Sequence, residues 1–227
     1  MSRFLRVFLI LKGESERVPG KNFRLLGDRP LYRWILDTVL ALPETSELLI
    51  DTDVPERLTG LPVDPRLRVV RRRADLLGHD VTANALIAAH IDAGPEGALW
   101  LMVHATSPLL SAETLRGALA AWDARPPGRD SLFGVTAHHA RFYDADGVAW
   151  NHDPARLVPT QALAPVYQEN STLYLFDRAS FHAAGGRIGR APVLFPTPAL
   201  ESLDIDTEAD WALVHALAAA RQAEDRP

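Results

Sequence analysis

Short apolar runs alternate with longer amphipathic stretches along the first half of the chain. The apolar runs predict strands at residues 5–11, 48–50, 67–70 and 98–103, and the periodic stretches predict helices at 31–42, 83–91 and 112–122. The run 98–103 has almost no polar residue, which is typical of a strand covered on both faces. This alternation predicts an α/β fold built on a mostly parallel sheet.

The rhythm changes after residue 130. Further strands are predicted at 131–135, 171–176 and 202–206, and a last helix at 208–221, where Thr207 and Asp210 form a capping pattern. Residues 138–170 are polar and contain several prolines. We interpret this stretch as an excursion from the main sheet, and an ordinary surface insertion is the alternative.

Composition limits the class of protein. A chain of 227 residues that is 47% apolar predicts one domain over 1–227. A formal charge of -5 gives no basic field for nucleic acid, and the absence of cysteine excludes disulfides, thiolate zinc sites and cysteine chemistry. The first apolar stretch carries Arg3 and Arg6, unlike a signal peptide or a membrane span. We therefore expect a cytoplasmic protein without a membrane partner.

The loop at residues 12–22 follows the first predicted strand, where open α/β sheets bind ligands. It is not a P-loop, because six residues separate Gly13 from Gly20 and Asn22 replaces the Ser or Thr of that motif. Lys12 and Lys21 are the only lysines among 24 basic residues. An ammonium is a compact partner for phosphate, so we interpret both as phosphate contacts rather than as solvated surface lysines.

Two acidic residues end the predicted strand 202–206. Alternation along that strand would place Asp204 and Asp206 on one face, where they repel each other unless a cation lies between them. Hard oxygen ligands beside a triphosphate favour Mg²⁺, with Mn²⁺ as a second possibility. The alternative is that Asp206 only caps the last helix. The histidines His138, His139 and His152 lack the spacing of a metal site.

Four motifs in order resemble the acylneuraminate cytidylyltransferases and the related 3-deoxy-octulosonate cytidylyltransferases over nearly the whole chain. The first and most specific is the opening loop with its Pro-x-Lys-Asn sequence, and the others lie at 72–76, 106–109 with 170–175, and 202–207. The resemblance implies a Rossmann-like three-layer α/β/α nucleotidyltransferase fold with a small dimerisation excursion at 138–170 that also covers the substrate. It also implies a homodimer.

The function that the resemblance implies is transfer of CMP from CTP to an acidic acceptor, most simply a nonulosonic or sialic-type sugar acid, with release of pyrophosphate. Several departures concern the acceptor: Lys12 replaces an arginine, Arg17 a glycine, His104 a glutamine and Gln168 an arginine. These changes make a small phosphonate or another anionic acid the alternative acceptor. Rivals from other classes are a glycosyltransferase, which usually carries its Asp-x-Asp motif mid-chain, and a nucleotide-binding homologue without turnover.

The predicted site residues fall into four groups. The catalytic residues are Lys12, Lys21 and Asp206, and the metal ligands implied by the resemblance are Asp204 and Asp206. The nucleotide-binding residues are Leu11, Lys12, Gly13, Ser15, Lys21, Asn22, Arg72 and Thr82. The acceptor-binding residues are His104, Thr106, Ser107, Gln168 and Asn170. The general base stays open between a metal-bound oxygen, His104 and an ionised group of the substrate.

Overall fold

The computed structural model describes residues 3–78 and 80–224, and its centre is a seven-stranded sheet in the order β5-β4-β1-β6-β8-β7-β9. The neighbours from β5 to β6 are parallel, whereas β8 runs antiparallel to both β6 and β7. A separate hairpin joins β2 to β3. The strands are β1 (Leu5–Leu11), β2 (Leu25–Leu26), β3 (Arg29–Pro30), β4 (Thr45–Thr52), β5 (Leu67–Arg71), β6 (Leu99–His104), β7 (Ser131–His138), β8 (Val166–Asp177) and β9 (Pro192–Pro196).

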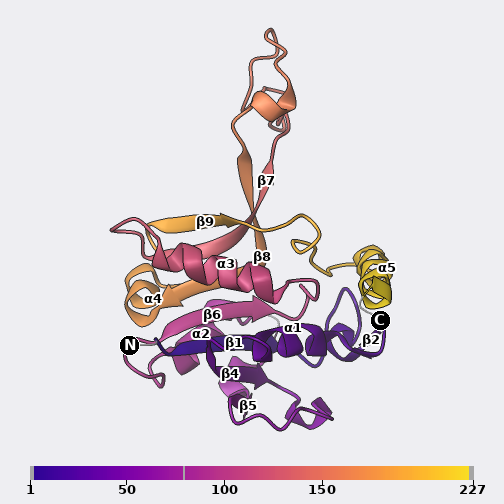
Figure 1. The fold of residues 1–227 in the computed structure, drawn as a ribbon, viewed down its shortest axis with the longest axis vertical. Coiled ribbons are helices and arrows are strands. Elements are labelled where there is room, and N and C mark those ends of the chain that lie inside the picture. Colours follow the sequence, from indigo (N-terminus) through magenta and orange to yellow (C-terminus); the bar gives the residue numbers. More distant parts are fainter. Residues whose placement is uncertain (1–2, 79, 225–227) are drawn as a thin grey trace.

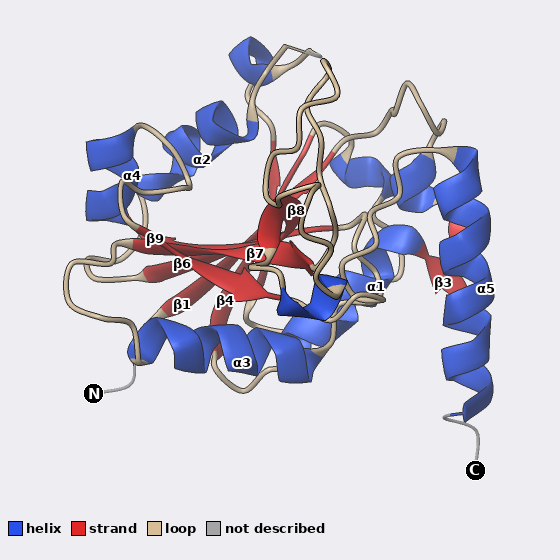
Figure 2. Ribbon diagram, turned by 90° about the horizontal axis from the view of Figure 1, so that it is seen from above, coloured by secondary structure: helices blue, strands red, loops and turns tan. Residues whose placement is uncertain are grey.

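Helices cover both faces of the sheet (Figure 2). Alternation along β1 sends Val7 and Leu9 into the layer beneath α1 and α3, and sends Phe8 into the layer beneath α2 and α4. The fold is therefore the three-layer α/β/α arrangement that the sequence predicts. No helix in the described residues is long and apolar enough to cross a membrane. The helices are α1 (Leu31–Leu40), α2 (Ala83–Ile91), α3 (Ala112–Asp123), α4 (Arg178–Ala184) and α5 (Glu208–Glu224), with single 3₁₀ turns at Lys21–Phe23, Pro55–Arg57, Ala74–Leu76 and Thr160–Ala162.

The predicted strand at 202–206 is wrong. This segment has no regular structure, and it is attached to the end of β6 by the hydrogen bond from the Ile205 amide to the Thr106 carbonyl, 3.1 Å. The buried Ile205 side chain anchors it among residues of α5 and the first loop. The sequence pattern also gave no sign of β9, an edge strand that begins and ends with proline, or of the seven-residue α4.

A long ribbon leaves the sheet where β7 and β8 lose their regular register. Phe133 pairs with Tyr174 but Val135 pairs with Glu169, so Gly134 faces four residues of β8. A Cβ on Gly134 would lie 2.2 Å from the Thr172 Oγ1 atom, so only glycine fits there. Beyond this bulge, residues 138–166 form an arm that projects away from the body of the protein (Figure 1).

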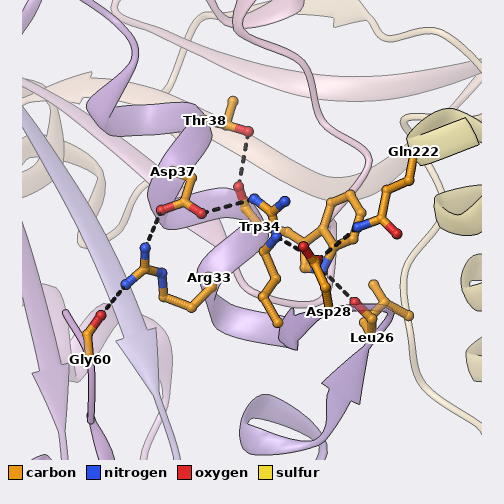
Figure 3. A network of polar contacts seen from close by, with 9 residues as sticks. Leu26, Asp28, Arg33, Trp34, Asp37, Thr38, Gly60 and Gln222 are labelled. Carbon is orange, nitrogen blue, oxygen red and sulfur yellow. Dashed lines mark hydrogen bonds and ion pairs between the residues drawn. The ribbon is translucent and has the colours of Figure 1, made fainter. Parts of the chain in front are cut away.

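Polar contacts tie both α1 and the C-terminal helix α5 to the β2–β3 hairpin (Figure 3). Trp34 on α1 donates to the Leu26 carbonyl at 3.0 Å, and Gln222 on α5 donates to Asp28 at 2.8 Å. Leu26 is also buried among the apolar residues of α5. The β2–β3 hairpin therefore connects α1 to α5, and α5 in turn carries the end of the 202–207 segment.

Candidate active site

A cleft of about 540 Å³ opens at the carboxyl ends of β1 and β6. These strands are parallel neighbours, and their register pairs Ile10 with His104. Lys12 continues from β1 and His104 ends β6, so both contribute to the wall of the cleft together with Lys21, Thr106 and both carboxylates of the 204–206 segment. We call this space the loop cleft. It lies where ligands bind in open α/β sheets.

The first loop is held against the end of β4. The Gly13 amide donates to Asp53 at 2.8 Å, and Arg57 donates to the Gly13 carbonyl at 2.8 Å. A Cβ on Gly13 would approach Val54 to 2.7 Å, so the close contact requires a glycine. Asn22 closes the loop from within by donating to the Lys12 carbonyl at 2.9 Å. Ser15 and Asn22 line the cleft, whereas Gly13 supports the loop from behind.

Lys21 connects this loop to the C-terminal segment. Its ammonium donates to the Ile205 carbonyl at 2.6 Å and lies 3.6 Å from Asp206, with only 13% of the side chain exposed. Arg17 makes a closer ion pair with the same carboxylate, at 2.7 Å. Two cations of one loop therefore meet the carboxylate that the sequence analysis assigned to the metal.

Of the two carboxylates, Asp204 has the environment that is less favourable for the ionised form. Burial, with the charge of Asp206 adding to it, raises the pKa of Asp204, although a hydrogen bond from Thr106 acts in the opposite direction. Its Oδ1 atom is buried without a hydrogen-bond partner. A free carboxylate oxygen beside a second carboxylate fits a divalent cation. No group of three or more His, Asp or Glu side chains that could hold a metal occurs in the described residues, so bound phosphate or water would have to supply further ligands.

His104 faces the cleft as a neutral imidazole. Burial, together with the positive charges of Arg187 and Lys21, lowers the pKa of His104 to about 3. The Nε2 atom is buried without a partner, and so is the hydroxyl of Ser107 three residues further on. Within residues 3–78 and 80–224, these two atoms and the Asp204 Oδ1 are the buried side-chain polar atoms without a partner. Buried polar atoms without a partner are rare in folded proteins, and a catalytic role is one of the explanations for them.

Besides Gly13, three of the predicted nucleotide-binding residues lie outside the loop cleft. Leu11 is fully buried, and its carbonyl accepts a hydrogen bond from Arg72 at 3.1 Å. Arg72 is itself buried in an ion pair with Asp51 at 2.6 Å. Thr82 caps α2 by accepting from the Ala85 amide, and it lines a neighbouring cavity.

The predicted acceptor-binding residues also separate. His104 and Thr106 line the loop cleft, and Ser107 lies behind it. Gln168 lies at the base of the arm and contacts His138 at 2.9 Å. Asn170 is buried in the bulge, where its amide donates to Thr197 at 2.7 Å.

Three further residues near the cleft were not predicted from the sequence. Ser171 lines it and is the one described residue other than glycine with a positive φ, at 58°. Such strain in a β-strand residue accompanies functional sites, and it arises here from the bulge, which sequence periodicity does not reveal. Glu169 and Arg187 line the adjoining cavity. The only signal in the sequence was a basic residue after the Gly185-Gly186 turn.

Comparison with known proteins identifies relatives in sequence and in fold. A relative, N-acylneuraminate cytidylyltransferase of Oncorhynchus mykiss, is 24% identical over 216 residues, which cover 92% of this chain and 49% of that protein, so the chain spans about half the length of this relative. A 4-diphosphocytidyl-2C-methyl-D-erythritol synthase from Anaerococcus prevotii has the same fold with a TM-score of 0.65 and 15% identity, over 95% of this chain and 96% of that one. A CMP:2-keto-3-deoxy-manno-octonic acid synthetase solved with CTP has a TM-score of 0.67 and 14% identity, over 96% and 99%. The cytidylyltransferase family model matches residues 11–214, and the chain belongs to the cytidylyltransferase family.

Proposed function

We propose that the chain transfers CMP from CTP to a small acidic acceptor and releases pyrophosphate. The observation that carries this proposal is the meeting of Lys21, Asp204 and Asp206 in one cleft at the carboxyl edge of the sheet. Family membership supports the same reaction. The nonulosonic or sialic-type sugar acid remains the first choice of acceptor, and a phosphonate the second.

In this reaction an acceptor oxygen attacks the α-phosphorus of CTP, a new P–O bond forms, and the bond to the departing pyrophosphate breaks. Lys12 and Lys21 hold the phosphates from the loop side, while Asn22 keeps the loop closed through its bond to the Lys12 carbonyl. Asp204 and Asp206 would hold Mg²⁺, which when bound neutralises charge that develops on the phosphates. Lys21 then also positions Asp206 through the Ile205 carbonyl.

His104 suits a hydrogen-bond acceptor better than a general base. A base with a pKa of about 3 takes up a proton poorly near neutral pH. Its buried Nε2 atom can nevertheless accept a hydrogen bond from the attacking hydroxyl and hold it in line. Orientation of the nucleophile is therefore the role that we propose for His104.

We also propose that the arm at 138–166 pairs with a second copy of the chain. Five apolar or aromatic side chains of the arm and its base are exposed, namely Tyr143, Val148, Trp150, Leu157 and Tyr167. Figure 1 shows this arm projecting away from the body of the protein. A dimer would bury these side chains and bring the partner's arm towards an active site.

Pyrophosphate release from CTP tests the reaction. The purified protein is assayed with Mg²⁺ and N-acetylneuraminate, 3-deoxy-octulosonate or 2-aminoethylphosphonate. Lys21→Met should lower turnover about a hundredfold or more, because one charge contact to the transition state is lost. Arg116→Met, a half-exposed position on α3, is the control and should behave as the unmodified protein. Release of no pyrophosphate with any acid, or normal turnover by Lys21→Met, would overturn the proposal.

A further inference from the structure

A second cavity of about 350 Å³ adjoins the loop cleft. The start of α2, the bulge of β8 and the turn after α4 form its walls, and Ala83 lines both spaces. Its polar lining consists mainly of Thr82, Asn84, Glu169 and Arg187. We call it the Arg187 cavity. None of its charged groups has a part in holding the phosphates in the proposed reaction.

Among the described residues, Arg187 has one ion pair, with Glu169 at 3.6 Å, which is too long for a hydrogen bond. Only 19% of the side chain is exposed, and its hydrogen bonds go to the Tyr174 hydroxyl at 3.0 Å and to the Met102 sulfur at 3.6 Å. The guanidinium also lies 3.8 Å from the centre of the Tyr174 ring. Glu169 is 3.6 Å away, but the same carboxylate oxygen already accepts the hydrogen bond of the Tyr174 hydroxyl. A largely buried guanidinium is stable in such surroundings when an anion completes its contacts.

The positive charge of Arg187 acts on His104, which lines the loop cleft. Together with burial, it lowers the pKa of His104, whose ring stands 6.2 Å from that of Tyr174. Ser171, held at a positive φ beside them, lines the loop cleft, and its Oγ atom lies 3.3 Å from the Tyr174 hydroxyl. Tyr174 therefore separates an anion-binding group on one side from the unpartnered Nε2 of His104 on the other.

We infer that the Arg187 cavity binds the oxyanion of the acceptor, a carboxylate or a phosphonate, and that Arg187 thereby selects which acids the enzyme uses. This inference rests on the proposed CMP transfer. A planar guanidinium can bind either oxyanion through two parallel hydrogen bonds. Glu169 adds an acceptor for a hydroxyl or amino group of the same molecule. The attacking oxygen of the acid then points towards His104 and the loop cleft.

Equilibrium binding by calorimetry tests this site without turnover. The probes are N-acetylneuraminate and 2-aminoethylphosphonate, each titrated into the full chain, and CTP is titrated separately. Arg187→Met fills a similar volume without the charge and should weaken binding of the preferred acid about tenfold to a hundredfold, with CTP affinity unchanged. Arg187→Lys should recover part of the loss. Arg190→Met, an exposed position on the same segment, should change neither affinity.

The possible results distinguish failure of the anion site from failure of the proposed reaction. Binding of both probes to Arg187→Met as to the unmodified protein, or of neither probe to the unmodified protein, overturns the inference. A parallel loss of CTP affinity in Arg187→Met also overturns it, since the residue would then be structural. If the acid binds through Arg187 but no pyrophosphate is released from CTP, the proposed reaction fails while the anion site stands. If turnover proceeds with an unchanged KM in Arg187→Met, the anion site fails while the reaction stands.

Discussion

The neutral state of His104 gives the protein a specific sensitivity to acid. The pKa of His104 is about 3 in the folded chain, against 6.5 for an ordinary histidine. Above pH 6.5 the residue is neutral in the folded and in the unfolded chain, so it adds no pH dependence to the free energy of unfolding. Below pH 6.5 the unfolded chain binds a proton that the folded chain refuses, so stability falls as the pH drops towards 3.

The magnitude follows from the two pKa values. Between these two pKa values, each pH unit of acidification lowers the free energy of unfolding by about 1.4 kcal/mol. Between pH 6.5 and pH 5, His104 alone should therefore lower the free energy of unfolding by about 2 kcal/mol. His104→Gln cannot take up the proton, so the variant should lack this part of the loss. The contributions of the acidic residues are common to both proteins and cancel in the comparison.

Urea unfolding at pH 7 and pH 5 measures the difference. The unmodified protein should lose about 2 kcal/mol more than His104→Gln on acidification. His215→Gln changes an exposed histidine of α5 and should retain the loss of the unmodified protein. Equal losses in His104→Gln and the unmodified protein would refute the buried, cation-flanked environment. Resonances of the His104 ring that titrate near pH 6.5 would do the same.

Three further predictions concern other parts of the molecule. The pKa of Asp204 is raised in the folded chain, so its ionisation lowers stability as the pH rises through that pKa. Asp204→Asn should therefore raise Tm at pH 7, and it should also remove the extra stabilisation by Mg²⁺ with CTP. An unchanged Mg²⁺ effect in thermal denaturation would exclude Asp204 as a ligand. Gly134→Ala should cost about 1 to 3 kcal/mol of unfolding free energy, because its Cβ would overlap Thr172. Equilibrium denaturation measures the cost, with Gly117→Ala on α3 as the comparison, because a Cβ there meets Phe195 only at an ordinary contact distance of 3.4 Å. Trp150→Asp combined with Leu157→Asp should shift sedimentation from dimer to monomer, whereas a dimer that persists would exclude this surface.

The local pattern was sufficient to predict every strand of the sheet except β9, and to locate the first loop at its carboxyl edge. The strand at 5–11 and the helix at 83–91 have the bounds that periodicity indicates, because their apolar residues face covered layers. Lys12 and Lys21 were found because they are the only lysines of the chain. Such features depend on residues close in sequence, and these are what a sequence displays directly.

Contacts between distant segments could not be predicted in the same way. Alternation along a strand was the wrong reason for grouping Asp204 with Asp206, because the segment is irregular and owes its position to Thr106 and Lys21. Arg187 contacts Glu169 and Tyr174, which flank the bulge of β8, and the extra residues of that bulge follow no periodic pattern. Side chains placed by a bulge or by a single tertiary hydrogen bond leave no local signal.

The unpartnered atoms of the site link its stability to its function. The Nε2 of His104, the Ser107 hydroxyl and the Asp204 Oδ1 belong to two segments that the Ile205–Thr106 hydrogen bond joins. Each buried polar atom without a partner costs about 1 to 3 kcal/mol, so the folded chain bears this cost at one edge of its sheet. In the proposed reaction, the acid, the nucleotide and the cation would supply an oxygen, a donor and a charge to the same place. Ligands that satisfy these atoms therefore stabilise the fold and the reactive geometry together. For that reason, a substitution that removes one of these buried polar atoms should lower activity without lowering the stability of the ligand-free protein.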